Sequence, residues 1–156
     1  MKDSTRRNEA RKILRRWAKI DDEISAAEMA YKALCDEIDM VAAIPSPTQK
    51  LTGMPHTAGG ASQQTESVAL RRVSLAEAYQ DRLQAYNGKV IEGLRFKMRV
   101  QDAMILCEPE AVKVVEQHWK GKAYMFDVAK ALNISESTAW RYERIVLDAI
   151  ADEFGF

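Results

Sequence analysis

The segment from Tyr124 to Ile150 constrains the fold most, because its residues meet the demands of a helix-turn-helix in order. Ala129 stands where two helices would cross, and a small residue there lets their backbones approach. Asn133 follows at a tight turn, where a left-handed backbone is often needed and Asn tolerates it better than most residues. Ile134 would fill the angle between the helices, and Ser135 is a natural N-cap. The segment therefore predicts two helices joined by a short turn.

Apolar residues recur at helical spacing in both of these helices, and this spacing predicts which faces they bury. In the first helix, Phe126, Val128 and Leu132 are expected to face inward. In the second helix, the residues expected to face inward are Ala139, Tyr142, Val146, Leu147 and Ile150.

The first segment, residues 4–42, contains no Gly or Pro and predicts a long helix. Its apolar residues are spaced by four and three without a slip, which is typical of a coiled-coil seam. A helix of this length cannot bury its stripe alone. We therefore expect a hairpin partner in the same chain and a dimer through the hairpin. The seam residues are Ile13, Trp17, Ile20, Ile24, Ala27, Tyr31, Leu34, Ile38 and Val41.

A loop is expected at 43–66, where three of the four prolines and several glycines gather. A second helical segment over 66–106 has a weaker stripe, and Asn87-Gly88 suggests a kink or a break in it. Pro109 suits the first turn of a further helix that reaches about Trp119.

These elements predict an all-α protein. Residues 1–107 would form a long helical hairpin with the 43–66 loop, for dimerisation or partner binding. Residues 108–156 would form a small helix-turn-helix domain that binds DNA.

The charge balance is unusual for a protein that binds DNA, because 23 basic residues are matched by 23 acidic ones. From Glu110 onward, six basic residues stand against eight acidic ones. Phosphate contacts supply most non-specific affinity, so this part alone is expected to bind DNA weakly. Dimerisation, the basic N-terminus or a protein partner on the DNA would have to add affinity.

The most basic stretch lies near the N-terminus, and it has two readings. It is either a helical arm that contacts phosphates or a solvated face balanced by the acidic residues that follow it, and we favour the second. The stretch comprises Arg6, Arg7, Arg11, Lys12, Arg15, Arg16 and Lys19.

No apolar run approaches the roughly 20 residues of a membrane span, and no signal peptide is recognisable. The isolated cysteines Cys35 and Cys107 favour a reduced, cytoplasmic protein. With His56 and His118 they show no ligand-like spacing, so neither a metal nor another cofactor is expected. No phosphate loop or nucleophile setting is present, so an enzyme is not expected.

Taken together, the chain resembles the RinA/ArpU-like regulators of phages and prophages, whose C-terminal part is similar to region 4 of bacterial sigma factors. One anchor is Thr52-Gly53-Met54-Pro55 with Gly59-Gly60. The other is the C-terminal pattern Trp119, Val128-Ala129, Leu132, Ile134-Ser135, Ser137-Thr138, Trp140-Arg141-Tyr142 and Leu147. The resemblance implies an activator of late phage operons.

The N-terminal part of the second helix is expected to meet base edges. Arg141 could contact guanine with both nitrogens of its fork, and Glu136 could accept from cytosine N4. Trp140 could touch a thymine methyl group or pack on a neighbouring helix. The residues expected to contact double-stranded DNA are Lys122, Tyr124, Ser135, Glu136, Ser137, Thr138, Trp140, Arg141 and Arg144.

The favoured interpretation is a sequence-specific transcriptional regulator, an activator that acts near RNA polymerase. One alternative is a phage packaging protein that resembles a terminase small subunit, in which the hairpin forms rings. The usual order of that class places the helix-turn-helix first, whereas here it is last. Another alternative is a helical adaptor whose helix-turn-helix contacts protein rather than DNA.

Overall fold

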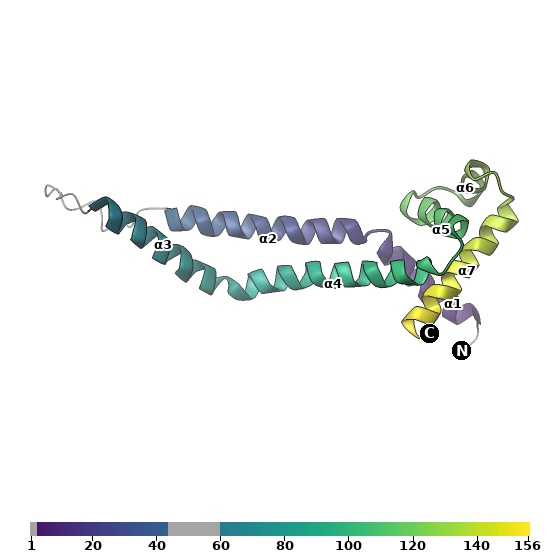
Figure 1. The fold of residues 1–156 in the computed structure, drawn as a ribbon, viewed down its shortest axis with the longest axis horizontal. Coiled ribbons are helices and arrows are strands. Elements are labelled where there is room, and N and C mark those ends of the chain that lie inside the picture. The colour runs from purple at the N-terminus through teal and green to yellow at the C-terminus, as the bar shows by residue number, and fades with distance from the viewer. Residues whose placement is uncertain (1–2, 44–59) are drawn as a thin grey trace. The chain divides into compact units, whose positions relative to one another are not determined.

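A computed structural model describes residues 3–43 and 60–156, and within these ranges every element is a helix (Figure 1). The all-α prediction is confirmed. The chain divides into two compact units. The larger unit combines residues 1–24 with 91–156, and the smaller one comprises residues 25–90. The helices α2 (Ile20–Ala43) and α4 (Gln80–Ile105) contribute residues to both.

The N-terminal helix is shorter than expected, because α1 (Asp3–Trp17) ends before α2 begins. A tight turn separates them, in which the Lys19 amide donates to the Arg16 carbonyl at 3.0 Å. The buried face of α1 comprises Ala10, Leu14 and Trp17, so Leu14 takes the place expected for Ile13. The break lets α1 follow a packing partner of its own, as described below.

The second helical segment also differs from expectation. Helix α3 (Gly60–Ala78) begins inside the expected 43–66 loop, and residues 44–59 lie outside the described ranges. The break before α4 falls at Tyr79, whereas Asn87 and Gly88 lie inside α4. A glycine inside a helix costs only about 1 kcal/mol relative to alanine, which neighbouring turns outweigh.

In the smaller unit, α2 buries Ala27, Leu34 and Ile38 of the expected seam. Tyr31 is exposed, so the seam is interrupted there. The spacing of apolar residues by four and three therefore identifies most of the buried face of α2, because residues at that spacing share one side of a helix. An ion pair at 3.0 Å joins Arg72 of α3 to Asp39 of α2.

In the larger unit, α7 (Glu136–Phe154) has a buried stripe that runs to its C-terminal end. Helix α1 packs against it and adds ion pairs, Arg7 to Asp148 at 2.8 Å and Arg6 to Asp152. Proline begins α5 (Pro109–Val115) as expected. The compact unit that contains residues 108–156 also includes α1 and the end of α4.

The start of α2 and the end of α4 approach closely within the larger unit, and Gly93 permits this approach. A Cβ atom at Gly93 would lie 2.7 Å from Cγ1 of Ile24. Two ion pairs flank the contact, Arg16 to Glu92 at 3.1 Å and Lys97 to Asp21 at 2.6 Å.

Among the described helices, none is long and apolar enough to cross a membrane.

Candidate nucleic-acid interface

Two helices meet through a tight turn near the C-terminus. Helix α6 (Met125–Ala131) ends at Leu132, and Asn133 has a φ of +55°, the left-handed conformation expected of the turn residue. The Ile134 amide then donates to the Ala129 carbonyl at 3.0 Å, which closes the turn. Ala129 is buried, as required where two backbones approach. This turn fixes the direction in which α7 leaves α6.

The N-terminus of α7 is capped by Ser135. Its Oγ accepts from the Thr138 amide at 3.2 Å, which satisfies one of the free N–H groups of the first turn. The same Oγ lies 2.7 Å from the Thr138 hydroxyl and 3.1 Å from the Ser137 hydroxyl. Three hydroxyl groups therefore gather at the tip of α7, with Ser135 and Ser137 exposed and Thr138 half-buried.

All five α7 residues expected to face inward are buried. For α6 the expectation was wrong in one place, because Phe126 is 63% exposed and Met125 is buried instead. Met125 is three residues before Val128 and four before Ala129, so these three side chains share one face of the short helix. Phe126 and Tyr124, which is 80% exposed, present aromatic side chains to solvent at the N-terminal end of α6.

The exposed side of α7 carries two arginines in its N-terminal half. Arg141 and Arg144 are exposed, and neither forms an ion pair with any described residue. The same holds for Lys122, which precedes α6 and has a left-handed φ of +53°. Ser137 lies four residues before Arg141, so both lie on one side of the helix. The first three turns of α7 thus display two arginines and hydroxyl groups beside the exposed carboxylate of Glu136, and neither arginine forms an ion pair with a described residue.

Trp140 is in contact on two sides. Its indole N–H donates to the Glu136 carboxylate at 3.3 Å, and its ring meets the His118 ring edge-on, with centroids 5.9 Å apart. The side chain is nevertheless 38% exposed. Trp140 therefore packs on a neighbouring helix, which is one of its two interpretations, and part of its side chain also remains exposed to solvent.

A buried carboxylate of α7 accepts a hydrogen bond from the π-helix η2 (Glu116–Lys120). Glu143 is 2% exposed and accepts from the Trp119 indole N–H at 3.0 Å. His118 lies with its Nε2 3.8 Å from the same carboxylate, while its Nδ1 donates to the Ala123 carbonyl at 2.8 Å.

The sequence analysis named Trp119 and His118 for other reasons and did not single out Glu143 as their partner. The signal was available, because Glu143 falls on the buried stripe of α7 at helical spacing and a carboxylate there needs a donor.

Two residues of the basic stretch have a role that neither reading included, whereas Arg16 pairs with the following acidic residue Glu23 at 3.6 Å, as the solvated-face reading expects. Arg6 and Arg7 pair with carboxylates of the C-terminal half of α7, and Arg99 of α4 pairs with Glu153 at 3.2 Å. Carboxylates at the C-terminal end of α7 are therefore neutralised by arginines, whereas Arg141 and Arg144 form no ion pair with a described residue, and Arg141 lies over the Tyr142 ring at 5.7 Å.

A hydrogen bond to a second carboxylate, that of the exposed Glu110, fixes the middle of α7. The Tyr142 hydroxyl donates to Glu110 of α5 at 3.0 Å. This hydrogen bond, together with burial, raises the pKa of Tyr142 above its usual range. The arrangement orients α7 on α5 and leaves the opposite side of α7 to solvent.

The described residues hold no group of three His, Cys, Asp or Glu side chains suited to a metal ion, and His56 lies outside the described ranges. No protein-family model, curated protein or solved structure matches the chain, so the interpretation of this surface depends on its geometry and on the sequence.

Proposed function

We propose that α6 and α7 form a helix-turn-helix that reads double-stranded DNA, and that the protein is a sequence-specific transcriptional regulator. The separation of charge along α7 is the observation that supports this most. Arg141 and Arg144 are exposed and unpaired near the N-terminus of the helix, whereas Asp148 and Asp152 near its C-terminus are neutralised by α1. In this fold class the N-terminal end of the second helix enters the major groove.

The individual roles follow from where each side chain lies. Arg141 is the candidate for a bidentate contact with guanine, and Ser137 reaches bases on the same side. Arg144, Lys122 and Tyr124 are candidates for phosphate contacts, which position the protein without reading sequence.

Glu136, Ser135 and Thr138 already form hydrogen bonds within the protein, which limits their proposed contacts with DNA. Glu136 is held by Trp140, so its acceptance of a cytosine N4–H requires that bond to open or to be shared. Ser135 and Thr138 are engaged in the cap, and their part is to fix the tip of α7.

We further propose that the regulator belongs to a phage or prophage, acts as an activator near RNA polymerase and binds as a homodimer. The resemblance of the sequence to RinA/ArpU-like regulators supports the first two points. A dimer is supported by the modest number of free cations on one unit, because two half-sites double the phosphate contacts. Dimerisation through a helical hairpin formed by α2, α3 and α4 is part of this proposal.

The decisive experiment measures binding of the purified protein to its own upstream DNA and to a scrambled duplex, at about 50 mM and about 150 mM salt. Arg141→Ala should weaken specific binding by about 5- to 150-fold, the cost of one bidentate pair. Arg95→Ala, which removes an exposed arginine of α4, is the matched control and should change little. Equal affinity for both duplexes, unaffected by Arg141→Ala, would contradict a DNA reader.

One observation favours a second candidate function, a helical adaptor that binds protein. Tyr124 and Phe126 expose aromatic side chains at the N-terminal end of α6, and exposed aromatic residues often bind proteins. Replacement of Phe126 by Ser should abolish co-purification with RNA polymerase if the adaptor function holds. DNA affinity should be retained by the same variant if the surface only recruits polymerase. Ring assembly in native mass spectrometry would instead support the packaging protein.

A further inference from the structure

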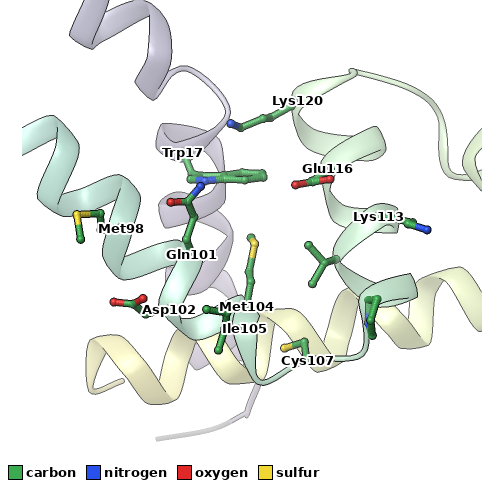
Figure 2. A pocket seen from close by; sticks show the side chains of 12 residues that line it. Trp17, Met98, Gln101, Asp102, Met104, Ile105, Cys107, Lys113, Glu116 and Lys120 are labelled. Carbon is green, nitrogen blue, oxygen red and sulfur yellow. The ribbon is translucent and has the colours of Figure 1, made fainter.

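The larger unit contains a cavity of about 650 Å³ that the proposed DNA-binding surface does not use. It lies between Trp17 of α1, the end of α4, and the helices α5 and η2 (Figure 2). Met104 and Val112 contribute apolar surface, and the indole ring of Trp17 forms one wall. A largely apolar cavity of this size with a few polar groups is typical of sites for small molecules.

The charged side chains around the cavity are not equivalent. Figure 2 shows Glu116 on the side of its helix that faces Trp17, whereas Lys113 and Asp102 point away. Glu116 has no ion pair or hydrogen bond through its side chain with any described residue. The ammonium group of Lys120 is engaged, because it lies 4.3 Å from the centroid of the Trp17 ring and 3.1 Å from Asp21. The unpartnered charge that faces the cavity is therefore a carboxylate.

A second polar group at the cavity lacks a partner. The indole N–H of Trp17 is buried, and no acceptor for it is found among the described residues. Buried polar groups are nearly always satisfied, so an exception at a cavity wall is informative.

The backbone at this site is itself unusual. Glu116 and Lys120 are the first and last residues of the π-helix η2. Such π-helical turns are rare in proteins, and those that occur often lie at functional sites. The same turn carries His118 and Trp119, which contact Trp140 and Glu143 of α7. One short element thus connects the cavity with the helix that we propose reads DNA.

From these observations we propose that the cavity binds a small organic cation with an apolar body, whose ammonium group pairs with Glu116 and whose body packs on Trp17 and Met104. Ligand binding would shift η2 and, through the contacts of His118 and Trp119, would also shift α7. The ligand site stands independently, whereas its effect on DNA affinity rests on the proposed function.

Three probes with one body and different head groups test the site: 4-phenylbutylamine, 4-phenylbutanol and 4-phenylbutyrate. Each is titrated into the full chain without DNA, and the three indole N–H signals are followed by ¹H–¹⁵N NMR, assigned with Trp→Phe variants. The amine should shift the Trp17 signal saturably, with a Kd of about 0.1–1 mM for a ligand of this size. It should bind about tenfold more tightly than the alcohol or the acid.

Two variants decide whether the site is the one described. Glu116→Gln should weaken binding of the amine about tenfold and remove its advantage over the alcohol, because the charge-assisted contact is lost. Asp81→Asn removes the same charge from an exposed residue of α4 that does not line the cavity, and it should leave the affinity unchanged. A Trp17 signal that does not saturate, equal binding of the acid and the amine, or an unaffected Glu116→Gln variant would each overturn the proposal.

The effect on DNA is measured separately. Saturating amine should change the affinity for upstream DNA at least threefold in the wild-type protein and not in Glu116→Gln. If the amine binds but DNA affinity does not change, the coupling to α7 is wrong and the ligand site stands. If the protein binds no DNA at all, the proposed function fails, while the NMR titration still decides the ligand site.

Discussion

Two glycines in α4 should respond in opposite ways to the same substitution. At Gly88 an added Cβ meets no atom within 4 Å, so Gly88→Ala should gain the helix propensity of alanine, about 0.5–1 kcal/mol. At Gly93 the Cβ would lie 2.7 Å from Cγ1 of Ile24, which is not the flexible end of that side chain. Overpacking of this kind costs about 1–3 kcal/mol. The loss should exceed the gain, and Gly93→Ala should lower stability by up to about 2 kcal/mol.

Urea denaturation followed by far-UV circular dichroism measures both changes, with Gly88→Ala as the matched control. Removing the obstacle should reverse the sign, so adding Gly93→Ala to an Ile24→Ala background should stabilise that background. If Gly88→Ala and Gly93→Ala stabilised the wild-type chain equally, the close approach of α2 and α4 at this point would be refuted.

Three further predictions concern the larger unit. Asn133→Gly should leave thermal stability near the wild-type value and Asn133→Val should lower it by about 1–2 kcal/mol, because the turn needs a positive φ; equal melting temperatures would contradict this. Glu143→Ala should cost about 1–3 kcal/mol by leaving the Trp119 N–H unpaired, while Glu143→Gln keeps an acceptor and should cost less; the two are compared by urea denaturation. Hydrogen bonds from Lys97 and Lys120 lower the pKa of Asp21 below its unfolded value of about 3.8. The contribution of Asp21 to folding stability is therefore present above about pH 4 and is lost as the pH falls through the lowered pKa. Melting temperatures between pH 2 and pH 6 should therefore separate wild type from Asp21→Asn at the upper end and converge at the lower end.

Local signals made much of the C-terminal third predictable. A left-handed turn needs Asn or Gly, an N-cap needs a short hydroxyl or carboxylate side chain, and a buried stripe follows a period of 3.6 residues. Asn133, Ser135 and the inward face of α7 satisfy these rules through neighbours in sequence. For the same reason the helix that starts at Pro109 could be predicted without knowledge of its tertiary contacts.

Other features depend on contacts between distant residues, and the sequence alone did not reveal them. The seam spacing continues through Ala18 and Lys19, yet the helix breaks there, because α1 packs on α7 and buries Leu14 rather than Ile13. The α1 arginines could not be assigned to Asp148 and Asp152 from a linear pattern. The cavity beside Trp17 is likewise formed by segments far apart in the chain.

The larger unit is interrupted in sequence, and this affects how the protein is made. Residues 25–90 form an insertion between two pieces that must find each other, and α7 is synthesised long after α1. Until then, Arg6 and Arg7 lack their carboxylate partners and the apolar face of α1 remains uncovered by α7. Since the side chain of Ile24 already lies against Gly93, a short turn that replaces the insertion would join two neighbouring points of the backbone. Replacement of residues 25–90 by a short turn should therefore give a smaller protein that retains the proposed DNA-binding helices.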